Sequence, residues 1–224
     1  MRSLLSLLAV LLVAGCASSS RAPDAPRASW LLVGVDGQRT TPSLTTYLDR
    51  VGQQYTQRNA ERFAFARGNQ VEPLIGAAPA ETIVLVRFPG ARGVRDWYKS
   101  DAYQQLIPLR VNTGTYWLVS FEGSAAKLPG TTPAFLLLRG ELPAQDAAET
   151  DAIKHYGGVT VAQLGDGDID VLEGTVPKGA MRVIAFPSRA SLAALWLDPE
   201  FRAVRERWNV AGKTSATLVG GGKN

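Results

Sequence analysis

The strongest constraint on the fold of this chain is that its sequence repeats itself. Residues 86–90 read VRFPG and residues 184–188 read IAFPS, so a Phe-Pro pair in a similar setting returns 98 positions later. At this spacing, without a gap, further pairs coincide: Val71 with Ile169, Leu74 with Leu172, Gly76 with Gly174, Pro79 with Pro177, Tyr103 with Phe201, Leu106 with Val204, Gly114 with Gly212 and Gly123 with Gly221. Because turn residues and apolar positions match together, the sequence predicts two copies of one fold.

Both copies predict the same order of strands and helices. The first copy has strand patterns at residues 30–35, 63–67, 71–75, 82–88 and 116–121, and helical patterns at 44–58 and 94–110. The second copy has strand patterns at 135–138, 160–164, 169–172, 181–186 and 215–219, and helical patterns at 146–156 and 192–208. In each copy a proline-containing turn is expected to join the two central strands into a hairpin. The order is therefore βαββαβ, twice.

This order is that of a ferredoxin-like unit, in which two helices cover one face of an antiparallel sheet and the other face needs a partner. We expect one unit at residues 29–123, a linker at 124–132, a second unit at 133–221 and a tail at 222–224. Each sheet can bury its open face against the other. The sequence thus predicts an α+β fold, with two units packed as an intramolecular dimeric α/β barrel in a monomeric chain.

Motifs within the two copies resemble the DUF1330 family. The second copy carries IDVLEG at residues 169–174, FPS at 186–188, Trp196, DPEF at 198–201 and LV at 218–219. The first copy carries VEPLIG at 71–76, FP at 88–89, WY at 97–98, SDAY at 100–103 and LR at 109–110. The resemblance implies the dimeric α/β barrel superfamily, whose members include cofactor-free monooxygenases, isomerases, haem-processing enzymes and plain ligand binders. It transfers architecture and no reaction, because fold does not settle function.

The first sixteen residues are typical of a bacterial lipoprotein signal. Arg2 precedes an apolar run at residues 4–13, which is too short to span a bilayer, and residues 13–16 read VAGC, resembling a lipobox. We expect residues 1–15 to be removed, Cys16 to carry the lipid, and residues 16–28 to form a flexible tether. The protein is then anchored in the cell envelope. Since Ala17 is not the aspartate that retains enteric lipoproteins in the inner membrane, the outer membrane, facing the periplasm, is expected in a diderm.

Composition argues against several functions. The net charge is +4 and the basic residues are scattered, so no nucleic-acid partner is expected. One histidine and one cysteine exclude multi-histidine and multi-cysteine metal sites, and we expect neither metal nor cofactor. Residues 166–170 read DGDID and imitate the start of a calcium loop. Val171 and Pro177 then stand where that loop needs glycine and glutamate, so a polar turn is predicted.

Aromatic and arginine residues supply the candidate ligand-binding positions. They are Trp97, Tyr98, Tyr103, Arg110 and Trp196. The common interpretation of the rings is a helix face packed on its own sheet. The alternative is a pocket that takes a small apolar or anionic ligand, with Arg87 or Arg110 as its charged contact. Arg87 interrupts an apolar strand, so it needs a partner such as Glu72, unless it lies on the exposed face or end of the strand.

Catalytic candidates are few. They are Tyr98, Arg87 and His155, the last of which ends a short helix, where a solvated helix terminus is the ordinary interpretation. As a base, His155 would be oriented by Tyr156 or by a carboxylate such as Glu173. We therefore expect a small-ligand-binding or interaction module, and the alternative is a cofactor-independent oxygenase or isomerase. Convergent polar tips inside the barrel would favour an enzyme, whereas a filled apolar interior would favour an interaction module.

Overall fold

The computed structural model describes residues 27–176, 178–209 and 212–221. The expected signal at residues 1–15, Cys16 and the expected tail at 222–224 therefore lie outside the described residues. Within the described part, no helix has the length and apolar character needed to cross a membrane. The first strand already begins at Arg27, and Ala28 is 1% exposed, so the folded part starts two residues before the expected boundary at Ser29.

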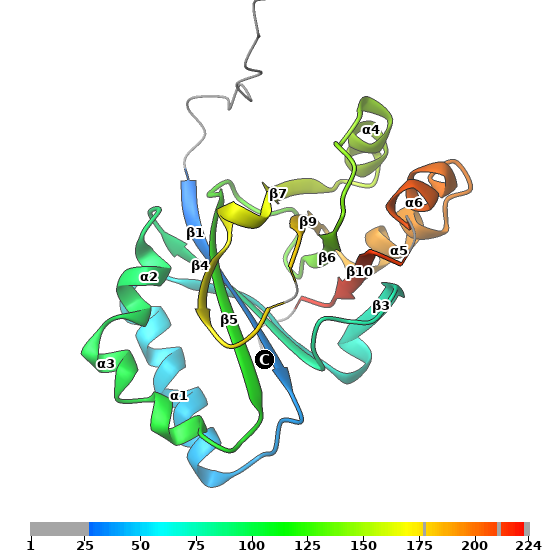
Figure 1. The fold of residues 1–224 in the computed structure, drawn as a ribbon. Helices are drawn as coiled ribbons and strands as arrows, with labels where there is room; N and C mark the ends of the chain where they lie inside the picture. Colours follow the sequence, from blue (N-terminus) through cyan, green and yellow to red (C-terminus); the bar gives the residue numbers. More distant parts are fainter. Residues whose placement is uncertain (1–26, 177, 210–211, 222–224) are drawn as a thin grey trace, which may run out of the picture.

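The predicted order of elements is confirmed in both copies (Figure 1). The first copy contains β1 (Arg27–Asp36), α1 (Pro42–Gln57), β2 (Glu61–Arg67), η1 (Gly68–Gln70), β3 (Val71–Ile75), β4 (Thr82–Pro89), α2 (Gly93–Tyr98), α3 (Asp101–Gln104), η2 (Ile107–Arg110) and β5 (Thr115–Ser124). The second contains β6 (Ala134–Gly140), α4 (Ala147–His155), β7 (Val159–Leu164), η3 (Asp166–Asp168), β8 (Asp170–Glu173), β9 (Ala180–Phe186), α5 (Arg189–Leu197), α6 (Arg202–Trp208) and β10 (Thr214–Val219). The η elements are short 3₁₀ turns.

The two copies exchange their edge strands. One antiparallel sheet has the order β2-β4-β1-β5-β8 and the other has the order β3-β10-β6-β9-β7. Strand β2 therefore passes through η1 into β3, which pairs with β10 of the second copy, and β7 passes through η3 into β8, which pairs with β5 of the first. Both edges of the barrel are closed by a strand that changes sheet. The expected hairpins were wrong in both copies: residues 71–75 do not pair with 82–88, and residues 169–172 do not pair with 181–186, because β2 and β7 take those places beside β4 and β9.

Apolar residues fill the space between the two sheets. Alternate side chains of each strand point inward, and the buried set includes Trp30, Leu85, Phe121, Phe135, Leu137 and Val183. Each such side chain contributes about 1.5–3 kcal/mol when fully buried. The predicted α+β fold, two ferredoxin-like units in one intramolecular α/β barrel, is confirmed.

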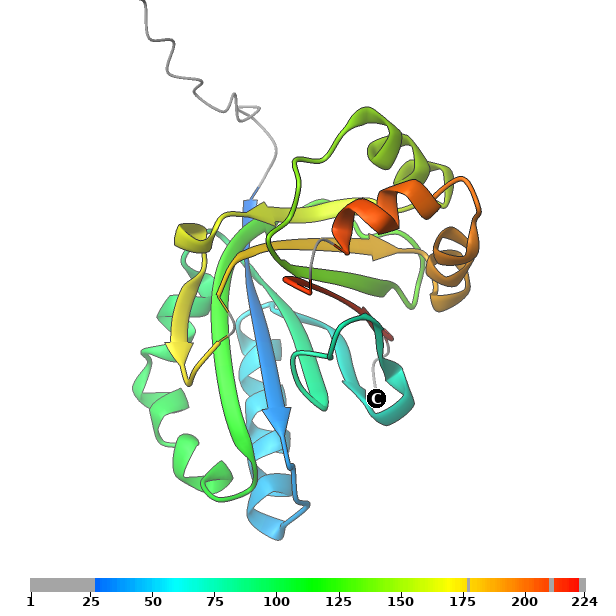
Figure 2. The same ribbon diagram turned by 45° about the vertical axis from the view of Figure 1, so that its right-hand side comes forward.

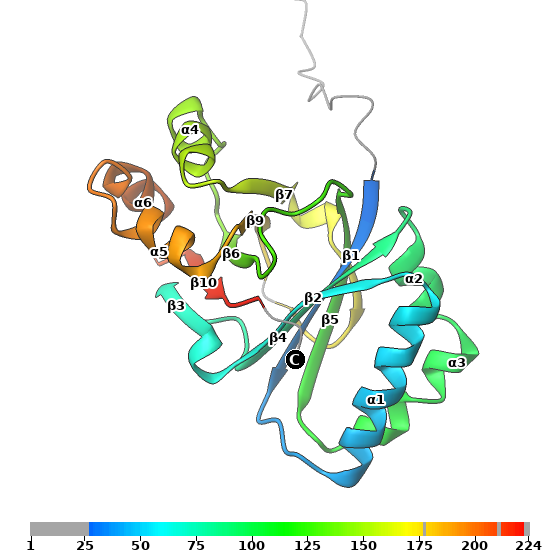
Figure 3. The ribbon, with the colours of Figure 1, turned by 180° about the vertical axis from the view of Figure 1, so that it is seen from behind.

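Helices cover the outer face of each sheet. Helices α1 to α3 lie against the first sheet and α4 to α6 against the second, as Figures 2 and 3 show from two sides. The helix expected at residues 94–110 is broken, because Ser100 caps a new start at α3 and Pro108 lies in the first turn of η2. The helix expected at 192–208 is likewise divided into α5 and α6, at Asp198 and Pro199.

The first helix starts as its sequence predicts. The Thr41 hydroxyl oxygen accepts a hydrogen bond from the N–H of Leu44 at 3.1 Å, and Pro42 occupies the first helical turn, where no N–H is missed. In the second copy Asp146 caps the shorter α4 in the same way, accepting from Glu149 N–H at 2.8 Å. Tyr47 lies on the buried face of α1, together with Leu44, Val51 and Tyr55.

Candidate functional site

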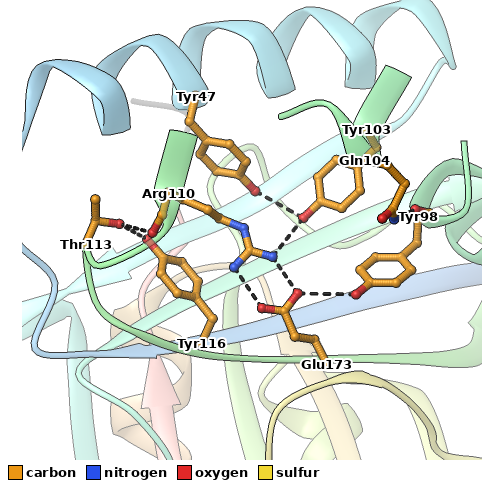
Figure 4. Close-up of polar contacts among 8 residues, drawn as sticks. All are labelled: Tyr47, Tyr98, Tyr103, Gln104, Arg110, Thr113, Tyr116 and Glu173. Atoms are coloured by element: carbon orange, nitrogen blue, oxygen red, sulfur yellow. Dashed lines mark hydrogen bonds and ion pairs between the residues drawn. The ribbon is translucent and has the colours of Figure 1, made fainter. Parts of the chain in front are cut away.

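A cluster of polar side chains lies between the first sheet and its helices (Figure 4). Its members are Tyr47 of α1, Tyr98 of α2, Tyr103 of α3, Arg110 of η2, Tyr116 of β5 and Glu173 of β8. We call these six residues the tyrosine–arginine cluster. Five come from the first copy and Glu173 from the second, so the strand exchange completes the cluster.

Arg110 and Glu173 are its centre. The guanidinium donates through Nη1 to Oε1 at 2.9 Å and through Nη2 to Oε2 at 2.5 Å, a bidentate pair. Arg110 is 3% exposed, and its Cζ lies 4.5 Å from the ring centre of Tyr116. Burial alone would lower the pKa of Arg110, but hydrogen bonding to Glu173 and the nearby Tyr103 and Tyr47 raise it overall. Arg110 therefore stays charged, and Glu173 neutralises it.

Three tyrosines beside this pair, Tyr47, Tyr98 and Tyr103, have pKa values raised above the ordinary 10.0. The Tyr98 hydroxyl donates to Glu173 Oε2 at 3.3 Å, and burial, followed by the charge of Glu173, raises the pKa of Tyr98 to about 12. The hydroxyls of Tyr47 and Tyr103 share a hydrogen bond of 3.3 Å. Desolvation raises the pKa of Tyr47 well above its ordinary value. At neutral pH these phenols can donate a proton or a hydrogen bond, and they are poor bases.

A glycine brings Glu173 close to the first sheet. Gly174 has φ +73°, and a Cβ at this position would lie 2.3 Å from the carbonyl oxygen of Tyr116. Any side chain would push β8 away from β5. The equivalent Gly76 after β3 also has a positive φ, of +64°, so both exchanged strands end in the same left-handed turn.

The second copy does not keep the cluster. At the offset of 98, Trp208 stands where the first copy has Arg110, and Phe201 stands for Tyr103. The second copy instead buries an ion pair between Glu149 and Arg182, each with 1% of its side chain exposed. The tyrosine–arginine cluster is therefore a feature of the first copy.

Arg87 has a structural partner, and the expected one was wrong. It pairs with Glu61 of β2, whereas Glu72 pairs with Arg189. Its Nη1 also donates to the carbonyl oxygens of Ala125 at 3.2 Å and Ala126 at 2.7 Å. Arg87 thus fastens the start of the linker to the edge of the first sheet.

His155 and Trp196 lie in the second copy, apart from the cluster. His155 ends α4 and meets the Tyr156 ring edge to face, with ring centres 5.0 Å apart. The Tyr156 hydroxyl donates to Asp198 at 2.9 Å, and Glu173 belongs to Arg110, so neither orients His155 by a hydrogen bond. Trp196 packs beside the helices of the second copy, with Arg205 over its ring.

Trp97 is fully buried, with its ring centre 4.0 Å from that of Tyr103, so these rings pack on their own sheet as the ordinary interpretation predicted. The DGD segment forms the 3₁₀ turn η3, a polar turn as predicted. Among the described residues, no group of three or more His, Cys, Asp or Glu side chains could hold a metal ion.

The sequence predicted Tyr98, Tyr103 and Arg110 as ligand-binding positions, did not predict Tyr47 or Tyr116, and indicated Glu173 only as a partner of His155. Tyr47 lies within the helical pattern at residues 44–58 and Tyr116 at the start of the strand pattern at 116–121, and neither pattern marks a polar contact. Glu173 carried a usable signal, because it stands where the first copy has the apolar Ile75. A charged residue that replaces an apolar one in a repeat is a candidate for an ion pair or a hydrogen bond that the other copy lacks.

A separate, open cleft of about 400 Å³ lies where α2, β5 and η3 meet. Its lining residues are Ala91, Arg92, Arg95, Ser120, Phe121, Glu122, Gly167, Asp168, Ile169 and Asp170. Unlike the closed tyrosine–arginine cluster, this cleft has room for a small molecule and carries charges of both signs.

The two sheets, their exchanged edge strands and the outer helices define a tandem protein of the α/β barrel class. The family described as "Domain of unknown function (DUF1330)" matches residues 38–124 and 144–222, most of the chain, and the chain belongs to this family.

Two solved structures are distantly similar. An anthrone oxidase-like protein is 12% identical, with a TM-score of 0.41 over 89% of this chain and 92% of that one. A dye-decolorizing protein from V. cholerae is 9% identical, with a TM-score of 0.40 over 88% of this chain and 95% of that one. No curated protein matches the chain.

Proposed function

We propose that this protein is a lipid-anchored protein of the cell envelope whose folded domain is a non-catalytic binding module. The non-catalytic role is supported by the apolar side chains that fill the space between the two sheets. In the described part of the chain this interior is packed with side chains such as Phe135 and Leu137, which leave no room for a polar reaction chamber among the described residues. Of the sequence candidates for catalysis, Arg87 pairs with Glu61, Tyr98 donates to Glu173, and His155 lies at the end of α4 in the second copy.

The tyrosine–arginine cluster supports a structural role for its charges. Arg110 is neutralised by Glu173, so a bare anionic ligand would have to displace a bidentate carboxylate from a buried site. The cluster therefore holds strand β8 of the second copy against the first sheet, and in this sense it is a lock between the two copies. Binding is better assigned to the open, charged cleft beside α2.

The anchor rests on the sequence of residues 1–16. Mass spectrometry of the mature N-terminal peptide from the host tests it. We expect a peptide that starts at Cys16 and carries a diacylglycerol mass, and we expect the Cys16→Ser variant to lack that mass and to leave the membrane fraction. An unmodified N-terminus in the wild type would overturn the anchor.

The binding role is tested by native mass spectrometry of the full chain, extracted from host membranes in a nonionic detergent. A bound small molecule of defined mass, present in repeated preparations, is the expected result. A chain that carries no small molecule and instead consumes a host metabolite on incubation would contradict the proposal.

A second candidate, a cofactor-independent enzyme, is favoured by one observation. The pKa of the half-buried Tyr98 is raised to about 12, so its hydroxyl is protonated at neutral pH. This hydroxyl donates a hydrogen bond to Glu173 and could donate a proton to a substrate. Incubating the protein with a small-molecule extract of the host tests this role. A mass change produced by the wild type but not by Tyr98→Phe would support the enzyme.

A further inference from the structure

The open cleft beside α2 has a filled counterpart in the second copy. Ala91 of the cleft is equivalent to Arg189, whose guanidinium donates to the carbonyl oxygen of Asn69 at 3.1 Å and pairs with Glu72. Asn69 and Glu72 are in turn equivalent to Gly167 and Asp170, which line the cleft. In the second copy an arginine therefore spans the space that an alanine leaves open in the first.

The sheet also opens at this point in the first copy only. The ladder between β10 and β3 includes the pair Val219–Val71. The ladder between β5 and β8 ends one step earlier, at Ser120–Asp170, so Phe121 is not paired with β8. The cleft is therefore a local departure from the internal symmetry of the fold, formed by a shorter ladder and a smaller side chain.

Most charges in the cleft are already paired. Arg95 takes over the role of Arg189 and donates to Asp170 Oδ2 through Nε at 3.1 Å and Nη2 at 2.7 Å. Glu122 accepts from Arg27 at 3.2 Å. Within each of these two ion pairs the opposite charges neutralise each other. The pairs also hold the walls of the cleft in place.

Two charges of opposite sign are left over. The Arg92 side chain, at the start of α2, makes no hydrogen bond or ion pair with any other described residue. Asp168, in η3, uses Oδ2 to accept from Gly165 N–H at 2.9 Å, and its Oδ1 accepts no hydrogen bond within the described parts of the chain. Both residues line the same cleft, from different elements.

We propose that this cleft binds a small zwitterionic ligand, whose ammonium group meets Asp168 and whose carboxylate or phosphate meets Arg92. The inference rests on the binding role proposed above and adds the site and the ligand class. One cation and one anion recognise a molecule that carries both charges better than a molecule with either charge alone. A cleft of about 400 Å³ suits a dipeptide or a phosphoethanolamine head group.

Isothermal titration of the detergent-solubilised full chain tests the ligand class. The probes are glycyl-leucine and O-phosphoethanolamine, compared with N-acetyl-glycyl-leucine, which lacks the ammonium, and glycyl-leucinamide, which lacks the carboxylate. We expect one zwitterion to bind at least tenfold tighter than both single-charge peptides. Preference for glycyl-leucine indicates a peptide source and preference for O-phosphoethanolamine a lipid head group. Equal binding of all probes, or no binding of either zwitterion, overturns the inference.

Filling the cleft tests the site. Ala91→Arg imitates Arg189 and should weaken zwitterion binding at least tenfold, whereas Ala190→Arg, the same change on exposed α5 of the second copy, should leave binding unchanged. Arg92→Gln, which alters only an exposed side chain, serves if Ala91→Arg does not fold. A host ligand that stays bound to Ala91→Arg would overturn the cleft as its site and leave the proposed binding function standing.

Discussion

Arg110 of the first copy and Glu173 of the second form a bidentate ion pair across the two halves of the sequence, at 2.9 and 2.5 Å. The pair exists because β8 leaves its own sheet and joins β5. It is thus both the centre of the tyrosine–arginine cluster and a lock on the exchanged strand.

Removing one partner of this lock should cost stability. Glu173→Ala leaves Arg110 buried and uncompensated, and we expect the free energy of unfolding to fall by about 2–3 kcal/mol, less than for a fully buried pair because Glu173 keeps some solvent contact. Urea denaturation measures the change. The double variant Arg110→Met/Glu173→Leu should recover most of it. Glu206→Ala, at the exposed Arg202–Glu206 pair, is the matched control and should change stability by less than about 0.5 kcal/mol.

The second copy offers a stricter version of this experiment. Glu149 and Arg182 are both fully buried, and the first copy has Val51 and Val84 at the equivalent positions. Glu149→Val should therefore destabilise the fold by about 3–5 kcal/mol. The double variant with Arg182→Val restores the apolar pair of the first copy and should match or exceed the wild type in urea. A double variant as unstable as the single one would show that the pair is needed for packing.

Alkaline pH should destabilise the first copy. Burial raises the pKa values of Tyr47, Tyr55 and Tyr103 above the ordinary value of 10.0. Above pH 10 these phenols ionise in the unfolded chain before they ionise in the folded one, so the unfolded state binds fewer protons and stability falls as pH rises. The contribution of these protonated tyrosines to the free energy of unfolding is therefore fully present below pH 10. Urea midpoints at pH 8, 10 and 11 test this, and a midpoint that rises above pH 10 would contradict it.

Arg87 should hold the linker rather than a ligand. Arg87→Ala removes its contacts with Glu61 and with the carbonyl oxygens of Ala125 and Ala126. We expect faster amide hydrogen exchange in residues 124–132, with little change in the barrel core. Arg87→Lys keeps the charge but lacks the planar fork that reaches Glu61 and the linker carbonyls together. This variant should therefore give an intermediate rate of amide hydrogen exchange. Unchanged exchange in the alanine variant would remove this role.

The repeat predicted the architecture because it marks turns and core positions at once. Phe88 and Phe186 anchor equivalent strands, and the caps at Thr41 and Asp146 are local signals. Strand exchange could not be predicted in the same way. The short strands β3 and β8 carry no local mark of which sheet they join, since that choice depends on packing between the copies.

The candidate site was partly predictable for the same reason. Tyr98, Tyr103 and Arg110 belong to one segment, so they were found together. Glu173 reaches them only through the exchange of β8, and the cleft beside Arg92 arises from a difference between the copies that has meaning only once the strands are paired. Trp196 stands 98 positions after Tyr98, but it packs with the helices of the second copy and not in the cluster.

The central claim is that the protein binds its ligand outside the tyrosine–arginine cluster, which only locks the copies together. The most direct test is native mass spectrometry of the Arg110→Met/Glu173→Leu variant, extracted from host membranes beside the wild type. We predict the same bound small molecule, with the same occupancy, on both proteins. Loss of that molecule from a variant that unfolds at the wild-type urea midpoint would contradict the claim and place the site at the cluster.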